Sequence, residues 1–279
     1  MNSVLITGGS GSFGRAFTSR LLQDNVERIC IFSRGEHAQA EMRGQFDDDQ
    51  RLRWFIGDVR DRDRLRRAME GVEVVVHAAA LKRIEVGQYN PVEMVKTNVL
   101  GAVNVIEAAM DAKVRKVVAL STDKAYQPIS PYGQSKALME SLILAANNTV
   151  GPEGPRFSVT RYGNVAGSNG SVIPLWRSQL ASGKTVSLTD PGCTRFWMTM
   201  AEAIDLVLST IETMPDTINI PQLSAFRLGD LATAMGVTNP VITGLPAWEK
   251  KHEGLRDGLT SDSARWMDIA ELTEALKIV

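Results

Sequence analysis

The sequence of 279 residues has few cysteines and no long apolar run, and each absence excludes a class of protein. Cys30 and Cys193 are too few for a disulfide framework, and they indicate a reducing compartment. No apolar run approaches the roughly 18 to 20 residues that span a bilayer. The first residues also lack the basic and apolar regions of a signal peptide. We therefore expect a cytoplasmic protein that binds no membrane.

An excess of either charge is also missing. Lys and Arg number 31 and Asp and Glu number 32, so the formal net charge is -1. Because nucleic-acid and anionic-membrane binders carry a basic excess, neither partner is expected. The three histidines and two cysteines do not have the spacing of a metal site, so no metal is expected either.

Short apolar runs alternate with amphipathic stretches through the first half of the chain. Buried parallel strands with helices on both faces have this pattern. We predict an α/β fold with a Rossmann-type, doubly wound parallel sheet in residues 1–163 and ligands at the carboxyl ends of its strands. The predicted strands are residues 4–7, 28–32, 51–56, 72–76, 116–120 and 157–161, and the predicted helices are 15–23, 61–69, 92–112 and 132–146.

After about Gly163 the pattern changes: the loops lengthen, and helices alternate with brief strands. Residues 164–279 are predicted to form a small C-terminal substrate lobe, with some exchange of chain between it and the first domain. Brief strands are predicted there at residues 217–220 and 241–243.

The first predicted strand leads into a glycine-rich turn. Gly8, Gly11 and Gly14 have the spacing GxxGxxG. In dinucleotide-binding folds the first glycine allows a tight turn, the second lets the main chain approach a pyrophosphate, and the third lets the helix pack on the strand. The N–H groups of the following helix then face the phosphates. Because a strand precedes the turn and a helix follows it, we predict a dinucleotide site.

The end of the second strand favours NADP over NAD. Enzymes that use NAD usually have an acidic residue there for the ribose diol, whereas this sequence has Ser33 and Arg34. A hydroxyl and a guanidinium suit a 2′-phosphate, since Arg forms charge-assisted bonds with phosphate oxygens. Glu36, close by, is the residue that favours NAD.

Residues after the third and fourth strands complete the predicted cofactor site. Asp58 is placed to meet the adenine amino group, and small side chains after strand four let the cofactor lie against the main chain. His77 is interpreted as a half-buried structural residue. The cofactor-binding set is Thr7, Gly8, Gly11, Ser12, Phe13, Gly14, Ser33, Arg34, Asp58, Val59, Ala78, Ala79, Ala80, Asn98, Tyr132 and Lys136.

A tyrosine and a lysine follow the fifth strand. Tyr132 and Lys136 are four residues apart on a predicted helix and therefore share one face. A nearby ammonium lowers the pKa of a phenol, which favours a base for a carbinol proton. Thr122 can hydrogen-bond the same reacting oxygen.

These segments together resemble the extended short-chain dehydrogenase/reductase superfamily: TGGSGSFG from Thr7, STDK from Ser121 and YGQSK from Tyr132. Within it, three further stretches resemble the inverting UDP-N-acetylglucosamine 4,6-dehydratases, which open the pathway to pseudaminic acid and related bacterial surface sugars. The stretches are residues 78–82, 96–102 and 194–197. The resemblance extends from about residue 3 to residue 252. Thr-Asp-Lys is its most specific part, because sugar epimerases generally lack the Asp-Lys pair.

The resemblance implies a lyase that moves a hydride within one UDP-linked hexose, through an NADP that stays bound. Tyr132 removes the C4 hydroxyl proton while the C4 hydride passes to NADP, and the hydride later returns to C6. Lys124 is implied as the base for the C5 proton and Asp123 as the acid for the departing C6 hydroxyl. A lysine base requires a lowered pKa, which a cationic or desolvated site can supply. Inversion at C5 requires reprotonation from the opposite face, where Tyr132 can contribute.

The resemblance also implies a substrate site and a homo-oligomer paired through the two long helices. Lys82 and Asn164 would lie at the sugar, and Arg195 would hold the pyrophosphate, where a guanidinium suits two phosphate oxygens. One segment departs from the family pattern G-I-R-P-G-E-K-x-H-E. Pro246 stands in place of its arginine and Trp248 in place of its glycine, so one pyrophosphate contact is missing or is supplied elsewhere.

Three alternatives remain open from the sequence. A retaining dehydratase or a C4 epimerase acting on UDP-sugars would have a similar fold. The third alternative is a non-catalytic NADP-binding regulator, which the altered segment at Pro246 favours slightly. The set of Asp123, Lys124, Tyr132 and Lys136 argues against a regulator, because a sensor has no use for it.

Overall fold

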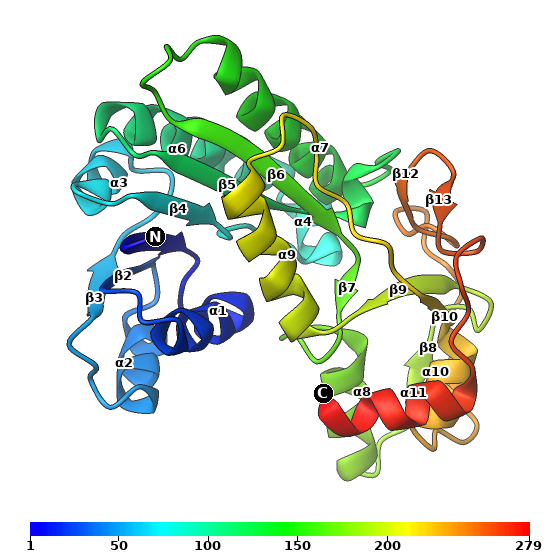
Figure 1. The fold of residues 1–279 in the computed structure, drawn as a ribbon. Helices are drawn as coiled ribbons and strands as arrows, with labels where there is room; N and C mark the ends of the chain where they lie inside the picture. Colours follow the sequence, from blue (N-terminus) through cyan, green and yellow to red (C-terminus); the bar gives the residue numbers. More distant parts are fainter.

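The computed structural model describes residues 1–279, and its first region is a six-stranded parallel sheet (Figure 1). The strand order is β3-β2-β1-β4-β5-β6. Such an order reverses direction between β1 and β4, and ligands of doubly wound sheets bind at this switch point. The strands are β1 (Ser3–Thr7), β2 (Arg28–Ser33), β3 (Leu52–Ile56), β4 (Val74–His77), β5 (Lys116–Thr122) and β6 (Arg156–Tyr162).

Helices cover both faces of this sheet because its strands are apolar on both sides. Val4 and Ile6 face one core with Phe17 of α1, whereas Leu5 faces the other core with residues of α3, α6 and α7. The helix α9 comes from the second half of the chain and packs against α1, β5 and β6. The helices are α1 (Ser12–Gln23), α2 (Glu36–Gln45), α3 (Arg62–Met69), α4 (Ile84–Tyr89), α5 (Pro91–Met94), α6 (Gly101–Asp111), α7 (Pro131–Ala145) and α9 (Met200–Thr213).

The second region is smaller and has its own core. Its three-stranded sheet has the order β10-β9-β7, and Trp176, Trp197 and Phe226 lie in the core beside it. Two short strand pairs, β8 with β11 and β12 with β13, complete it. The elements are β7 (Asn164–Val165), α8 (Val172–Ala181), β8 (Ser187–Leu188), β9 (Thr194–Met198), β10 (Ala225–Arg227), α10 (Leu228–Ala234), β11 (Val241–Ile242), β12 (Gly254–Arg256), β13 (Leu259–Thr260) and α11 (Ile269–Ala275).

The predicted fold class is confirmed, and so are the six strands of the first sheet, with small differences at their ends. Several details differ from the sequence predictions, and α8 to α11 and β9 were given no range there. The helices α2 and α4 were not predicted, and the long helix predicted at 92–112 contains a π-helical turn, η1 (Val95–Leu100). Residues 217–220 form no strand; Asn219 makes one isolated bridge to Thr160 at the edge of β6. Three short 3-10 turns are η2 (Asp123–Ala125), η3 (Ala146–Asn148) and η4 (Leu276–Ile278).

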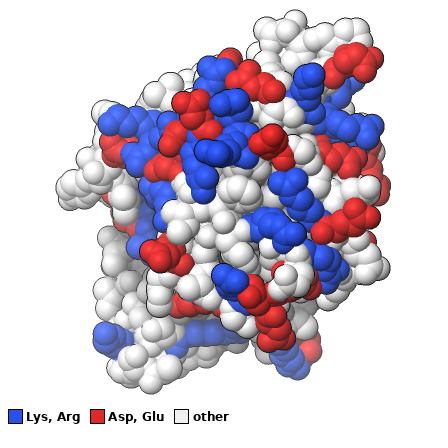
Figure 2. All heavy atoms as spheres, turned by 90° about the vertical axis from the view of Figure 1, so that its left-hand side faces the viewer, with Lys and Arg blue, Asp and Glu red and all other residues white.

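Charges of both signs are intermixed on the face that carries β3 and α2 (Figure 2). Several of them form ion pairs on this side, such as Arg43 with Asp48 and Arg62 with Asp111. No helix of the chain has both the length and the apolar character needed to span a bilayer.

Candidate active site

A cavity of about 950 Å³ lies at the carboxyl edge of the parallel sheet, with walls from both regions of the molecule. Its volume is at the upper end of the range of about 300–1,000 Å³ typical of ligand and cofactor pockets. All of the predicted site residues except Thr7 and Asn98 line it. The topology therefore brings together residues that are far apart in the sequence.

The glycine turn between β1 and α1 forms one end of the cavity. Gly8 has a φ of +68°, and a Cβ there would lie 2.9 Å from the Cα of Ala79. A Cβ on Gly14 would lie 2.2 Å from the carbonyl oxygen of Gly9, so only glycine lets α1 approach the turn this closely. The helix begins at Ser12 without a side-chain cap, which leaves the N–H groups of its first turn free at the cavity wall. This arrangement fits the phosphates of a dinucleotide.

The end of β2 has a hydroxyl and a guanidinium at the cavity. The Ser33 hydroxyl accepts hydrogen bonds from Ser10 Oγ at 2.9 Å and from Gln39 Nε2 at 3.0 Å. The Arg34 side chain is 55% exposed. Its guanidinium is therefore free to turn toward a ligand. Glu36, the residue that favoured NAD, begins α2 and does not line the cavity.

Asp58 is held by an arginine of its own loop. Its Oδ2 accepts a hydrogen bond from Arg60 NH2 at 2.7 Å, and its Oδ1 accepts one from the Arg60 main chain at 3.0 Å. Burial opposes ionisation, but the bonds from Arg60 outweigh it and lower the pKa of Asp58. Arg34 NH1 lies 3.7 Å away. Asp58 therefore forms an anionic wall of the cavity beside Val59.

Thr7 and Asn98 lie behind the cavity wall and support it. The Thr7 hydroxyl bonds to His77 Nδ1 at 2.7 Å and accepts a hydrogen bond from the Ala79 main chain at 3.2 Å. Asn98, in the π-helical turn, bonds to both main-chain groups of Leu81, at 2.8 and 2.9 Å. Both side chains thus fix the loop of small residues 78–80. His77 is fully buried rather than half-buried, and burial lowers its pKa to about 3.

The five predicted catalytic residues lie together at the carboxyl end of β5. Thr122 ends the strand, Asp123 and Lys124 form η2, and Tyr132 and Lys136 lie on α7. Thr122 Oγ1 and Lys124 Nζ both donate to Asp123 Oδ1, at 2.9 and 3.0 Å. All five line the cavity. An acid, an amine and a phenol therefore share one part of it.

Burial dominates the ionisation of Tyr132. It raises the pKa of the phenol to about 12, although the charge of Lys124 opposes this. Lys136 Nζ donates to the Leu120 carbonyl at 2.6 Å, and burial lowers its pKa to about 8. The expectation that Lys136 lowers the pKa of Tyr132 is thus not met. Desolvation of the phenol is the stronger effect, and Tyr132 is protonated at neutral pH.

The pKa of Asp123 fits its expected role as an acid, whereas the pKa of Lys124 does not fit its expected role as a base. Burial raises the pKa of Asp123, and the nearby carboxylate of Glu253 adds to this, as an acid requires. Burial acts to lower the pKa of Lys124, but the charges of Asp123 and Glu253 outweigh it and raise that pKa. The lowered pKa expected for a lysine base is therefore absent. Two carboxylates hold Lys124 as an ammonium.

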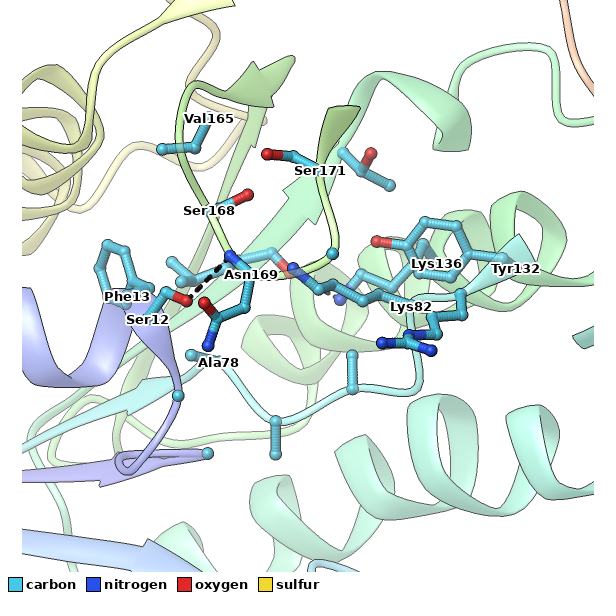
Figure 3. Close-up of a pocket in the computed structure, with 18 of the residues that line it drawn as sticks. Ser12, Phe13, Ala78, Lys82, Tyr132, Lys136, Val165, Ser168, Asn169 and Ser171 are labelled. Atoms are coloured by element: carbon cyan, nitrogen blue, oxygen red, sulfur yellow. Dashed lines mark hydrogen bonds between the residues drawn. The ribbon is translucent and has the colours of Figure 1, made fainter. Parts of the chain in front are cut away.

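Lys82 and Asn164 extend the site toward the second region. Asn164 begins β7, and its Oδ1 accepts a hydrogen bond from Lys124 Nζ at 3.5 Å. Lys82 follows β4, and burial lowers its pKa. Figure 3 shows the side chains of Lys82, Lys136 and Tyr132 directed into the same part of the cavity. These residues surround a space that is polar on several sides.

Arg195 lies at the far wall, but its guanidinium is already bound. Only 5% of the residue is exposed. NH1 donates to the Thr194 carbonyl at 2.7 Å, and NH2 donates to the Glu249 carboxylate. A phosphate could engage Arg195 fully only by displacing Glu249.

The segment after Gly244 contributes more to the site than the sequence analysis indicated. Trp248 and Glu249 line the cavity, and Lys250 and Glu253 lie directly behind Asp123 and Lys124. The resemblance to a family segment marked this stretch but assigned no role to its acidic residues. Their position depends on a fold-back from the second region that no local pattern reveals.

A second contact between the regions is the loop before α8. The Asn169 main chain donates to Ser12 Oγ at 3.1 Å, at the start of α1 (Figure 3). Ser168 and Ser171 also line the cavity. The loop therefore closes the cavity over the glycine turn, and it was not predicted.

Comparisons with known proteins agree on one family. The model of the polysaccharide biosynthesis protein family matches residues 4–264. A UDP-N-acetylglucosamine 4,6-dehydratase (inverting) of Campylobacter jejuni is 46% identical over 90% of this chain and 76% of its own length. A UDP-glucose 4-epimerase of Rickettsia massiliae is 47% identical over 75% of this chain and 62% of its own length.

Solved structures have the same architecture. The X-ray structure of Pen from Bacillus thuringiensis superposes with a TM-score of 0.94 at 31% identity, and the match covers 100% of this chain and 98% of that one. The dTDP-glucose 4,6-dehydratase DesIV of Streptomyces venezuelae, solved with NAD bound, has a TM-score of 0.80 at 24% identity, over 97% and 90% of the two chains. The second likeness shows a common Rossmann-type fold.

Proposed function

The chain belongs to the polysaccharide biosynthesis protein family, and from this we propose that it is a nucleotide-sugar 4,6-dehydratase that acts on UDP-N-acetylglucosamine. The proposed product is a UDP-4-keto-6-deoxy sugar with inverted configuration at C5. One observation carries the proposal: Asp123, Lys124 and Tyr132 line the same cavity as the glycine turn. A dehydration that begins with oxidation at C4 needs an acid, a base and a phenol beside a dinucleotide.

The proposed cofactor is a tightly held NADP. The close approach of Gly14 to Gly9 and the uncapped start of α1 fit a pyrophosphate. Ser33 and the exposed guanidinium of Arg34 would hold a 2′-phosphate, and Asp58 would lie near the adenine. Bound there, a nicotinamide dinucleotide would take a hydride from C4 and return it to C6. Residues 1–163 would carry this site, and residues 164–279 would carry most of the sugar-nucleotide contacts.

Tyr132 would remove the proton of the C4 hydroxyl. The raised pKa of the phenol means that Tyr132 would begin protonated and would need stabilisation of its anion when the substrate is bound. The charge of Lys124 lowers its pKa and would supply part of this. Lys136, fixed by the Leu120 carbonyl, would position the ribose and the phenol.

Asp123 and Lys124 would carry out the elimination of water. The ketone at C4 acidifies the C5 proton, which one of the pair must accept while the C6 hydroxyl receives a proton. Transfer of one proton from Lys124 Nζ to Asp123 Oδ1, 3.0 Å apart, would produce an amine and a carboxylic acid together. Lys124 would then act as the base and Asp123 as the acid. Asp123 Oδ2 is buried and has no hydrogen-bond partner within the protein.

Lys82 and Asn164 would contact the hexose, and Arg195 would bind the pyrophosphate once Glu249 has moved. Pro246 replaces the arginine of the family segment, so Arg195 would carry a larger share of the phosphate binding.

The protein would work in the cytoplasm, consistent with two buried free thiols. A homo-oligomer is also proposed, because apolar side chains such as Tyr89, which is 89% exposed, gather on α4 to α7.

The test is incubation of the purified protein with UDP-N-acetylglucosamine. We expect a product lighter by one water, keto-sugar absorbance, and no stoichiometric consumption of added NADPH. Proton NMR of the product would give the configuration at C5. Unchanged mass together with an inverted C4 centre would instead support the second candidate, a UDP-sugar 4-epimerase, which the similarity to the Rickettsia massiliae enzyme favours. No turnover of any UDP-sugar would leave an NADP-binding regulator.

A further inference from the structure

A third carboxylate lies behind the Asp123–Lys124 pair. Glu253 is only 1% exposed, and its Oε1 lies 3.5 Å from Lys124 Nζ. Lys124 Nζ lies 3.0 Å from Asp123 Oδ1 on its other side. One ammonium is therefore shared by two buried carboxyl groups from different regions of the molecule.

The position of Glu253 is fixed from three directions. Its other oxygen, Oε2, lies 3.1 Å from Lys250 Nζ, and its main-chain N–H donates to Ser261 Oγ at 2.8 Å. Lys250 Nζ in turn donates to the Tyr126 carbonyl at 2.7 Å, directly after η2. The carboxylate cannot turn away to solvent without losing its ion pairs with Lys124 and Lys250.

The charges that face Glu253 come from every element packed against it. Asp123 and Lys124 face it from η2, Arg195 from β9 and Lys250 from its own segment. Burial opposes its ionisation, but the three cations outweigh burial and lower its pKa, so Glu253 is an anion. Because like charges oppose ionisation, this anion hinders loss of the proton from Asp123, and it also favours the ammonium form of Lys124.

We propose that Glu253 is a positioning residue that sets how many protons the Asp123–Lys124 pair holds. It does not line the cavity, and it acts through its contact with Lys124. Its buried charge helps the pair to keep the one proton that its members share, so that Asp123 can hold this proton before the C6 hydroxyl departs. The catalytic meaning of this inference rests on the proposed dehydratase function; the effect on protonation does not.

Two substitutions at the same position separate charge from packing. Glu253→Gln keeps the size of the side chain and removes the charge, whereas Glu253→Asp keeps the charge and shortens the side chain. If Glu253 acts through charge, Gln shifts both limbs of the kcat/KM pH profile to lower pH by about one unit, and Asp largely restores the wild-type profile. A purely structural role predicts the reverse order of damage, with Asp worse than Gln and neither limb displaced.

A second measurement does not depend on turnover. In the holoenzyme labelled with ¹³C-aspartate, the carboxyl signal that Asp123→Asn removes would be titrated by NMR. We expect Glu253→Gln to lower the pKa of Asp123 and Glu253→Asp to leave it near the wild-type value. An Asp123 titration unchanged by Glu253→Gln would overturn the inference even if dehydration is observed. If Glu253→Gln lowered the pKa of Asp123 but the protein turned over no UDP-sugar, the role of Glu253 would be supported and the proposed function would be refuted.

Glu140 supplies the matched control for burial. It is 3% exposed and pairs with Arg161 at 2.6 Å, and it forms no ion pair with Asp123, Lys124 or Glu253. Glu140→Gln is expected to lower the Tm but to leave the Asp123 titration in place. If it moved Asp123 as much as Glu253→Gln does, a general loss of packing would be the cause, and the specific role of Glu253 would be refuted.

Discussion

The two ends of the cavity differ in the groups that form them. The cofactor end, around Gly8–Gly14 and Ser33–Asp58, is shaped mainly by the main chain: a left-handed glycine, a close helix approach and free N–H groups. The proposed catalytic end, around Thr122–Lys124 and Tyr132, is shaped by buried ionisable side chains that contact one another. Main-chain geometry binds one ligand rigidly, whereas coupled charges can change their protonation during a reaction.

This difference predicts that dinucleotide binding and dehydration can be lost separately. The largest effect is expected from removal of the Lys124 side chain. Lys124→Ala is expected to reduce dehydration of UDP-N-acetylglucosamine by about 10³-fold, because it would remove the proposed base for the C5 proton. The bound dinucleotide, measured by its absorbance after release, should remain at the wild-type level. Lys184→Ala, on an exposed loop, serves as control. Turnover retained in Lys124→Ala would remove this lysine from the mechanism.

A substitution in the glycine turn is expected to disrupt the cofactor end instead. A Cβ on Gly14 would lie 2.2 Å from the Gly9 carbonyl oxygen, so Gly14→Ala must push α1 away from β1. We expect a loss of about 2–3 kcal/mol in the free energy of unfolding, measured with urea, together with loss of bound dinucleotide. Gly44→Ala is the matched control. Gly44 is exposed on α2 with nothing within 4 Å of a new Cβ, and alanine there should be neutral or slightly stabilising. Equal damage from both changes would argue against a special role of the turn.

These two ends were also unequally predictable from sequence. The strands of the first sheet are nearly continuous apolar runs, and glycine spacing has a local cause, so both could be identified directly. The helix α2 has few apolar residues and α4 has only six residues, which is why neither gave a clear helical period. The ionisation of Tyr132 and Lys124 could not be predicted, because it depends on burial and on Glu253 from a distant segment.

The buried His77, beside the cofactor end, is expected to make the stability of the protein depend on pH. Its pKa is lowered from 6.5 to about 3 by burial, so the folded protein holds it neutral. A histidine with a depressed folded pKa stabilises the protein fully above its unfolded pKa, and this contribution is lost as the pH falls from about 6.5 toward 3. We expect the free energy of unfolding to fall by up to about 1.4 kcal/mol per pH unit in this window from His77 alone.

The measurement is urea unfolding of wild type and His77→Gln between pH 4 and 7. The variant should show a smaller decrease on acidification, since glutamine cannot take up the proton. His37→Gln is the control, because the His37 side chain is 91% exposed. If wild type and His77→Gln lost stability in parallel, the buried imidazole would not be responsible for the acid sensitivity of this end.

The smallest effect is expected at Arg34, where the cofactor end depends on a side chain rather than on the main chain. Arg34 is more than half exposed and only loosely paired with Asp58, at 3.7 Å. Arg34→Ala should therefore weaken NADP binding by about tenfold, the loss of one charge-assisted contact to a 2′-phosphate. NAD, which has a free hydroxyl there, should bind with unchanged affinity, as measured by calorimetry on protein stripped of cofactor. If Arg34→Ala weakened the binding of both dinucleotides equally, Arg34 would contact a group that they share. If the wild type bound NAD more tightly than NADP, Asp58 and the nearby Glu36 would be the residues that select the cofactor.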